Sequence, residues 1–326
     1  MKLLAYSVRE DEKIYFESYG KKYGMEVIIR EDAPSLENAG QMEGCDCVSI
    51  ITTPVDRELI CRWKDAGVRH ISTRTVGYDH IDRLAAAEMG ITVSNVSYSP
   101  YSVADYAVML ILMAVRKVGI IARRYFGQDF TLRGVQGREL RNLTVGVVGT
   151  GRIGETVIGH LQGFGCRILA YDLYEKEAVN KMAEYVPLDR LFQEADVITF
   201  HAPSTKESHH MVNRETIAGM KDGVILVNTA RGSLIDTEAL IEGLESGKIG
   251  GAALDVLEDE QRIYYQDFKD QNICHRQMAV LANTPGVILT PHTAFFTDQA
   301  VSDMVEYSIR SCRQELEGEE DPFRIE

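Results

Sequence analysis

The chain has 326 residues, of which 45% are hydrophobic and 26% are charged. This length exceeds the size at which a single hydrophobic core stops growing, so it predicts two domains. The formal net charge of -14 argues against a nucleic-acid-binding protein, because Lys and Arg side chains are what hold a phosphate backbone.

Residues 1–100 alternate short β-like runs with helical patterns. The runs read KLLAYSV, MEVIIR, DCVSIIT, RHISTR and ITVSNV, and amphipathic stretches such as residues 10–22 separate them. Strands that alternate with helices predict βαβ units and therefore a parallel sheet. Pro100 then ends one element, and Ser102 or Asp105 is suited to begin a helix, so the chain is expected to break there between two domains.

From Leu143 the alternation resumes with stronger apolar runs. They read LTVGVV, CRILAY, DVITFH, GVILVNT, GGAALDV and GVILTPH. Near-continuous apolar runs are typical of strands that are buried on both faces of a parallel sheet. One of the intervening helical patterns, DTEALIEGLESG, ends at Gly247 in the manner of a helix C-terminus. The sequence thus predicts a second doubly wound domain, followed after His292 by one long amphipathic helix.

The cysteines and apolar segments bear on the compartment. No Cys-x-x-Cys pair occurs among the six cysteines, which predicts reduced, mostly buried thiols and no metal site. The N-terminal apolar run is too short for a signal peptide. The most apolar segment, residues 103–115, contains Asp105 and falls short of the roughly 20 residues that a membrane span needs, so we expect a buried helix. A cytoplasmic protein without a membrane partner is therefore expected.

The segment GTGRIG, residues 149–154, matches G-x-G-x-x-G directly after a predicted strand and at the start of a helix. Gly149 permits the tight turn, Gly151 lets the backbone approach a pyrophosphate, and Gly154 lets the helix close on the strand. The pyrophosphate then lies at the helix N-terminus, which favours anions. Asp172 ends the next strand, where a carboxylate accepts hydrogen bonds from the ribose hydroxyls. Only Lys176 follows nearby and no arginine, so NAD is favoured over NADP.

Hydride transfer between NADH and a carbonyl also needs a proton donor, a cation for an anionic substrate and a group that tunes the donor. In an open α/β sheet these groups are expected at the carboxyl ends of strands. Two histidines end strand-like runs, His201 and His292, and we favour His292 because the chain returns to the first domain after it. Arg231 follows another strand end and can bind a planar carboxylate in two places.

Four acids follow the run GGAAL and are candidates for the tuning carboxylate: Asp255, Glu258, Asp259 and Glu260. A carboxylate that is hydrogen-bonded to an imidazole holds its tautomer and keeps a proton available for donation. The spacing of these acids does not choose among them.

With these residues in place, the chain resembles the D-2-hydroxyacid dehydrogenase family, most closely its NAD-dependent D-lactate dehydrogenase branch. The resemblance extends over nearly the full length and rests on AYSVREDEK, VGYDHID, NVSYSPYSVADYA, VGVVGTGRIG, VNTARGSLIDTEAL, GAALDVLEDE and TPHTAFFT. It implies an α/β protein in which a Rossmann NAD-binding domain, residues 101–297, is inserted into a flavodoxin-like substrate-binding domain, residues 1–100 plus 298–326.

The family motifs imply a role for each matching residue. Arg231 would bind the substrate carboxylate and polarise its carbonyl, Glu260 would pair with the histidine, and His292 would donate the proton. Asp255 matches the acid beside the nicotinamide carboxamide.

The resemblance also implies that the backbone N–H groups of Val76 and Gly77 bind the substrate carboxylate, and that Tyr101 and Phe295 line the pocket. The helix that begins at Tyr101 would contribute to a homodimer interface. Further cofactor contacts would come from Arg152, Ile153, Ala202, Pro203, Ser208, Thr229, Ala230 and Arg231.

The expected reaction is the reversible reduction of a 2-oxoacid, in the first place pyruvate, to the (R)-2-hydroxyacid. The segment SIITTPVD has Ile50 and Ile51 where an aromatic residue is common, so branched or aromatic substrates stay open, as for an (R)-2-hydroxyisocaproate or phenyllactate dehydrogenase. A different class uses the same scaffold, the NADH-sensing corepressors, which need a peptide groove and usually a disordered tail. The short stretch after the last predicted helix makes that alternative less expected.

Overall fold

The computed structural model describes residues 1–41 and 44–325, and the chain divides into two compact units. Met1–Ser99 and Phe296–Glu326 form one of them, here called the terminal unit. Pro100–Phe295 form the other, the central unit. The sequence predicts breaks after residues 100 and 297, close to these limits.

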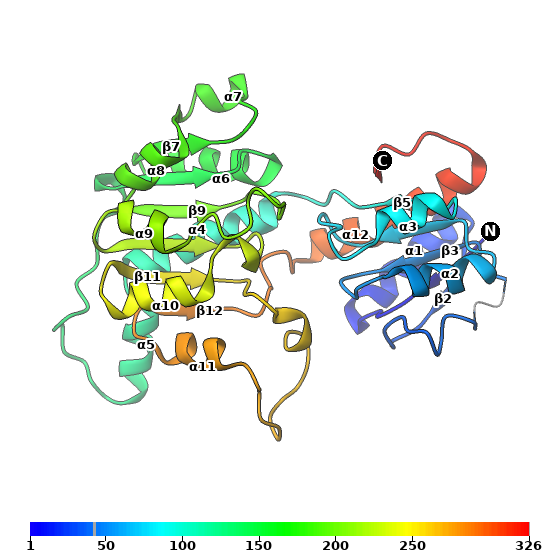
Figure 1. The fold of residues 1–326 in the computed structure, drawn as a ribbon, viewed down its shortest axis with the longest axis horizontal. Coiled ribbons are helices and arrows are strands. Elements are labelled where there is room, and N and C mark those ends of the chain that lie inside the picture. Colours follow the sequence, from blue (N-terminus) through cyan, green and yellow to red (C-terminus); the bar gives the residue numbers. More distant parts are fainter. Residues whose placement is uncertain (42–43, 326) are drawn as a thin grey trace. The chain divides into compact units, whose positions relative to one another are not determined.

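Within the described residues, the terminal unit contains a six-stranded sheet in the order β13-β5-β4-β3-β1-β2 (Figure 1). Its strands are β1 (Lys2–Ala5), β2 (Glu26–Ile29), β3 (Cys47–Ile50), β4 (His70–Thr73), β5 (Thr92–Ser94) and β13 (Arg324–Ile325). The first five strands are parallel and follow the order 2-1-3-4-5, which is that of flavodoxin-like sheets. This confirms the predicted doubly wound fold.

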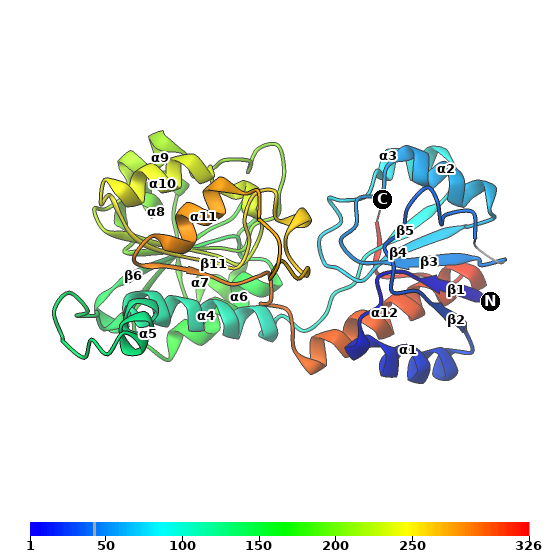
Figure 2. The ribbon, with the colours of Figure 1, turned by 90° about the horizontal axis from the view of Figure 1, so that it is seen from below.

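Helices cover both faces of this sheet (Figure 2). On one face, a hydrophobic cluster includes Phe16 of the first helix and Val305 and Ile309 of the last. On the other face, a cluster includes Trp63 and Ala85. The end of the chain therefore completes the unit that the beginning of the chain starts. The helices are α1 (Glu10–Tyr23), α2 (Arg57–Asp65), α3 (Arg83–Glu88) and α12 (Asp298–Glu317).

The strand β13, which the sequence analysis does not predict, runs antiparallel to β5 at the edge of this otherwise parallel sheet. The helix α12 ends at Gly318, whose φ of 73° lies in the left-handed region that favours glycine. Asp321 then anchors the returning chain. Its carboxylate accepts hydrogen bonds from Ser94 of β5 and from Ser311 of α12. This reversal places the last strand beside β5 in the opposite direction.

The central unit contains a seven-stranded sheet in the order β12-β11-β10-β9-β6-β7-β8, as far as the chain is described. All its pairings are parallel. Counted from β6, the order 3-2-1-4-5-6-7 contains the Rossmann arrangement, which confirms the predicted fold. The strands are β6 (Thr144–Val148), β7 (Arg167–Tyr171), β8 (Glu184–Tyr185), β9 (Val197–Phe200), β10 (Val224–Asn228), β11 (Ile249–Leu254) and β12 (Val287–Leu289).

Two hydrophobic clusters attach helices to opposite faces of the central sheet (Figure 2). The helices α4 (Tyr101–Val115), α5 (Val118–Phe126) and α6 (Arg152–Gln162) lie on one face. The helices α8 (Leu188–Glu194), α9 (Arg214–Gly219), α10 (Thr237–Glu245) and α11 (Arg276–Asn283) lie on the other. Shorter elements are α7 (Glu177–Asn180) and the 3₁₀ turns η1 (Leu140–Asn142), η2 (Gly232–Leu234) and η3 (Glu260–Arg262).

The apolar segment 103–115 forms most of α4, as predicted. Val103, Ala107 and Ile111 are buried, whereas Asp105 is exposed. Across the described residues, no helix is both long and apolar enough to cross a membrane. All six cysteines are free thiols, but only Cys45, Cys47 and Cys312 among them are buried.

A buried ion pair lies at the carboxyl edge of the terminal sheet. Arg74 follows β4 directly, and its Nε donates a hydrogen bond of 2.9 Å to Glu12 Oε1, with both side chains fully buried. The other guanidinium nitrogens donate to Ser49 Oγ at 3.0 Å and to the carbonyl oxygen of Tyr6 at 2.9 Å. The Arg74 side chain thus ties together α1 and the ends of β1, β3 and β4.

We expect Glu12→Gln to lower the free energy of unfolding by about 3 kcal/mol, because it leaves a buried guanidinium without its counter-charge. The chain has one tryptophan, Trp63, and it lies in the core of the same unit, so its fluorescence during chemical denaturation reports this unfolding. Lys13→Gln, which removes only ion pairs at the surface, is the matched control and should leave the midpoint unchanged. Equal midpoints for the two variants would contradict this account.

Candidate active site

The glycine-rich loop connects β6 to α6 and depends on close backbone contacts. Gly149 has a φ of 91°, and a Cβ atom at this position would lie 2.6 Å from the backbone nitrogen of Ala202. A Cβ atom on Gly154 would overlap the carbonyl oxygen of Gly149. At Gly151, in contrast, a Cβ atom would meet nothing within 4 Å. The loop is therefore packed on the protein side and open where the sequence predicts a pyrophosphate.

Asp172, directly after β7, faces this loop. Its Oδ2 accepts hydrogen bonds from the backbone N–H of Thr150 at 2.6 Å and from the Thr150 hydroxyl at 3.1 Å. Its Oδ1 accepts from the N–H of Tyr174 at 3.1 Å. The nearby base Lys176 forms an ion pair with Glu155, with 3.0 Å between Nζ and Oε2. The end of β7 therefore carries a carboxylate, and the nearby lysine is paired with an acid. This suits the ribose hydroxyls of NAD better than the 2′-phosphate of NADP.

His201 lies next to the glycine-rich loop, at the end of β9. Its Nε2 lies 2.9 Å from the Thr199 hydroxyl, and its Nδ1 is buried without a partner among the described residues. Burial lowers the pKa of His201 to about 3, so the ring is neutral at physiological pH. A histidine that stays neutral is poorly suited to donate a proton, which agrees with the lower rank that the sequence gives it.

The three predicted catalytic residues follow three neighbouring strands. Arg231, Glu260 and His292 come after β10, β11 and β12, which lie side by side and parallel in the sheet. Because parallel strands end at the same edge, the three side chains belong to adjacent loops of the central unit. The three residues are therefore close in the fold although they are far apart in the sequence.

His292 and Glu260 are in direct contact. The Nδ1 atom of His292 lies 2.5 Å from Glu260 Oε1, and both side chains are largely buried. The other carboxylate oxygen, Oε2, accepts a hydrogen bond of 2.6 Å from the N–H of Leu257. With Nδ1 engaged by the acid, Nε2 is the ring nitrogen left to exchange a proton with a substrate.

The structure separates the four acids that the sequence leaves open. Asp255 is buried and accepts hydrogen bonds from the residues around His292, Glu258 contacts His210, and Glu260 contacts His292. Asp259 has a φ of 57°, in the left-handed region, and precedes the turn η3. Asp255, Glu258 and Glu260 thus point to different neighbours.

Asp255 fixes the backbone on both sides of His292. Its carboxylate accepts hydrogen bonds from the Thr290 hydroxyl at 2.6 Å and from the N–H groups of Thr293 and Ala294 at 2.9 Å. The N–H of His292 donates to the carbonyl oxygen of Asp255 at 2.8 Å. These bonds hold His292 at a φ of 52°, which non-glycine residues adopt only where the surroundings enforce it.

The loop of Arg231 packs directly on the loop of Glu260. A Cβ atom on Gly232 would overlap the carbonyl group of Leu257, so only glycine allows the two backbones to come this close. Asn228 Nδ2 donates to the carbonyl oxygen of Arg231 at 2.8 Å and fixes the turn after β10. Backbone contact therefore sets the distance between the loops that supply the guanidinium and the carboxylate.

The other predicted contacts in the central unit follow the carboxyl edge of its sheet. The Phe295 ring lies 6.3 Å from the His292 ring, between centroids. Tyr101, in contrast, lies 5.8 Å from the ring of His160. Of the predicted cofactor contacts, Arg152 and Ile153 begin α6, Ala202, Pro203 and Ser208 follow β9, and Thr229 and Ala230 follow β10.

Val76 and Gly77 lie in the terminal unit, in the loop after β4. The Thr75 hydroxyl donates to the carbonyl oxygen of Gly77 at 2.6 Å, and Asn95 Nδ2 donates to that of Val76 at 2.7 Å. These bonds fix the loop through its carbonyl groups.

Two contacts near the site escape sequence reasoning. Tyr265 donates a hydrogen bond of 2.7 Å to the carbonyl oxygen of His292. His210 Nε2 lies 2.6 Å from Glu258 Oε1. The sequence gives no signal for either pair, because the partners lie on separate loops.

Comparison with known proteins gives the family. Residues 108–294 match the model of the D-isomer specific 2-hydroxyacid dehydrogenase, NAD binding domain. The chain is 45% identical to an aromatic 2-oxoacid reductase of Clostridium sporogenes over 98% of this chain and 97% of the relative. It is 38% identical to a D-lactate dehydrogenase of Lactiplantibacillus plantarum over 97% of each. The solved D-lactate dehydrogenase with NAD+ from Lactobacillus jensenii has a TM-score of 0.87 and 34% identity, over 100% of both chains.

The chain therefore belongs to the D-isomer specific 2-hydroxyacid dehydrogenase family. It is an NAD-dependent oxidoreductase, which confirms the predicted enzyme class and cofactor. The glycine-rich loop and Asp172 are suited to hold that cofactor, since the loop is open at Gly151 and acidic at the end of β7. The family membership accounts for the fold and for NAD binding without the NADH-sensing corepressor alternative.

We expect Gly154→Ala to weaken NADH binding strongly, because the added methyl group displaces the Gly149 carbonyl and opens the turn. Gly159→Ala is the matched control in the same helix, where a Cβ atom meets nothing within 4 Å. It should leave NADH binding unchanged and, by helix propensity, stabilise α6 by up to about 1 kcal/mol. Titration of NADH fluorescence separates the two variants, and equal affinities would refute the role given to Gly154.

Proposed function

We propose that Arg231, Glu260 and His292 catalyse the reversible reduction of a 2-oxoacid to the (R)-2-hydroxyacid. When bound, NADH supplies the hydride that reaches the carbonyl carbon. Arg231 binds the substrate carboxylate with its guanidinium and polarises the carbonyl group. His292 donates its Nε2 proton to the carbonyl oxygen, while Glu260 holds Nδ1 and stabilises the ring when it is charged. The 2.5 Å contact between Glu260 and His292, beside the loop of Arg231, is the observation that supports this proposal.

For the cofactor, we propose that the N-terminus of α6 and the open backbone at Gly151 bind the pyrophosphate. Asp172 accepts hydrogen bonds from the ribose hydroxyls and repels a 2′-phosphate. In the substrate site, the N–H groups of Val76 and Gly77 bind the carboxylate. Tyr101 and Phe295 contribute apolar surface.

His292→Ala should lower kcat by about 10²- to 10⁴-fold, because it removes the group that donates the proton. The binding of NADH should be retained, since the glycine-rich loop and Asp172 are untouched. Steady-state turnover together with NADH fluorescence titration checks both parts. A variant with kcat close to that of the wild type would exclude His292 as the proton donor.

We further propose that the preferred substrate carries an aromatic or branched side chain. Ile51 is half-buried and follows β3, the neighbour of β4, after which Val76 and Gly77 come. Its carbonyl oxygen accepts a hydrogen bond of 3.0 Å from Thr73 of β4, so these strand ends are joined. Ile50, by contrast, is fully buried in the core. Ile51 is therefore the isoleucine of this pair that can leave room for a large substrate side chain.

The identity of 45% to the aromatic 2-oxoacid reductase supports this preference. Pyruvate, the substrate first expected from the sequence, is the second candidate. It is favoured by the likeness to the D-lactate dehydrogenases.

For the wild-type enzyme, we expect kcat/KM for phenylpyruvate or 2-oxoisocaproate to exceed that for pyruvate by more than about tenfold. Ile51→Tyr should lower kcat/KM for the large substrates by at least about tenfold by filling the pocket, and change that for pyruvate little. Ile50→Val alters the core instead and should leave the substrate preference as it is. A wild-type enzyme that prefers pyruvate would overturn the proposed substrate but not the dehydrogenase mechanism.

A homodimer is proposed on the basis of an apolar face of the central unit. A groove of about 690 Å³ runs along α4 and α5 and is lined by apolar side chains that include Met109, Leu112 and Ile121. Phe126, the last residue of α5, and Leu132, beyond it, are 88% and 86% exposed. Exposed apolar surface of this extent is typical of protein interfaces, and a second copy of the chain could cover it.

A further inference from the structure

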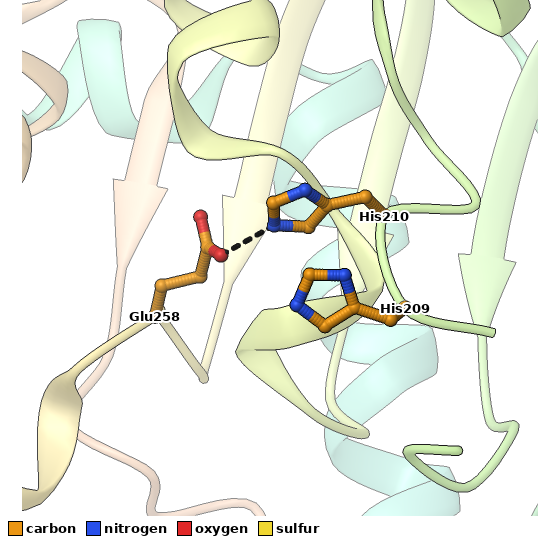
Figure 3. A group of neighbouring side chains, drawn as sticks. All are labelled: His209, His210 and Glu258. Atoms are coloured by element: carbon orange, nitrogen blue, oxygen red, sulfur yellow. Dashed lines mark hydrogen bonds and ion pairs between the residues drawn. The ribbon is translucent and has the colours of Figure 1, made fainter. Parts of the chain in front are cut away.

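Three potential metal ligands meet on the central unit. They are His209 and His210, in the loop after β9, and Glu258, in the loop after β11 (Figure 3). One ligand atom from each residue lies within 4.8 Å of the others. The sequence predicts no metal site, because its cysteines lack the spacing of zinc ligands. We propose that these three side chains bind a divalent transition-metal ion such as Zn²⁺.

The donor atoms suit this class of ion. Two imidazole nitrogens and one carboxylate oxygen are typical ligands of zinc, nickel and copper, whereas calcium and magnesium prefer oxygen ligands alone. With metal–ligand distances of about 2.0–2.2 Å, tetrahedral ligands lie roughly 3.3 Å apart. His210 Nε2 and Glu258 Oε1 are now 2.6 Å apart, so a small widening admits the ion in place of the shared hydrogen. Water can complete the coordination, because His209 is exposed.

Hydrogen bonds to other residues hold two of the ligands in place. Glu258 Oε2 accepts from the N–H of Thr237 at 3.0 Å and from its hydroxyl at 2.5 Å. The other carboxylate oxygen, Oε1, is therefore directed to the histidine side. The backbone of His210 has a φ of 50° and is fixed by bonds to Ser233 and Asn213. Outer partners of this kind orient metal ligands and raise their affinity.

The packing of the two imidazole rings also favours a bound cation. The centroids of the His209 and His210 rings are 3.9 Å apart, a distance at which two protonated rings repel each other. Neutral rings can share one metal ion without this cost. A plain surface ion pair would need only His210 and Glu258, whereas here the ring of His209 also lies against that of His210.

Occupation of the site would connect two loops with different predicted tasks. His209 follows Ser208, a predicted cofactor contact, and Glu258 lies two residues before Glu260. A metal ion bound by both loops would restrain them relative to each other. We therefore expect the ion to raise the thermal stability of the central unit, since it binds the folded chain and not the separated loops.

The test uses the full chain, freed of metal with a chelator and then titrated with ZnCl₂ in competition with a chromophoric chelator. The expected result is one tightly bound zinc ion per chain and a rise in the melting temperature. MgCl₂ should produce neither effect. The readout does not depend on dehydrogenase activity, so the metal proposal and the proposed reaction can fail independently.

His209→Ala is the decisive variant, because this side chain is exposed and its removal should not disturb the fold. We expect its zinc affinity to fall by more than about tenfold, and Glu258→Gln to have the same effect. His160→Ala, which changes another partly exposed histidine, is the matched control and should bind zinc as the wild type does. Equal zinc binding by the wild type and His209→Ala, or no stoichiometric binding by the wild type, would overturn the proposal.

Discussion

The buried carboxylate of Asp255 determines where the proposed proton donor can lie. It accepts three hydrogen bonds from the segment around His292 and joins the loop after β12 to the end of β11. A buried carboxylate needs several donors to offset its lost hydration, and here the backbone of the neighbouring loop supplies two of them. The same bonds hold His292 in its left-handed conformation. The position of the His292 imidazole is thus fixed by hydrogen bonds to Asp255 at the edge of the sheet.

Close backbone contacts at three glycines then fix the loop of Arg231 and the turn that leads into α6. Gly232 brings the loop of Arg231 onto the backbone at Leu257, and Gly149 and Gly154 close the turn that leads into α6. Each of these contacts excludes a side chain for steric reasons. The glycine-rich loop and the loops of Arg231, Glu260 and His292 are therefore all placed by the sheet of one unit.

Three acids of the loop after β11, within six residues, make three different contacts. Asp255 supports the His292 segment, Glu258 faces the two histidines after β9, and Glu260 engages the imidazole of His292. Their different directions follow from the left-handed backbone at Asp259 and from the packing against Gly232. If Glu258 binds a metal ion as proposed, the loop that carries Glu260, the partner of His292, would also respond to that ion. The family resemblance gives no indication of such a link.

The sequence by itself determined the two doubly wound sheets and the glycine-rich loop, because continuous apolar strands and glycine spacing are local patterns. The role of Asp172 in holding the cofactor stays a prediction. The sequence also singled out Arg231 and His292, since both follow strand ends; their catalytic roles stay predictions. The family resemblance implied that Glu260 pairs with His292, and the folded chain has that contact. Only the tertiary structure decided why β13 runs antiparallel and that His209, His210 and Glu258 meet. These features depend on loops from separate strands and on backbone conformations at single residues. Such contacts have no periodicity or spacing in the chain, so only the folded sheet brings them together.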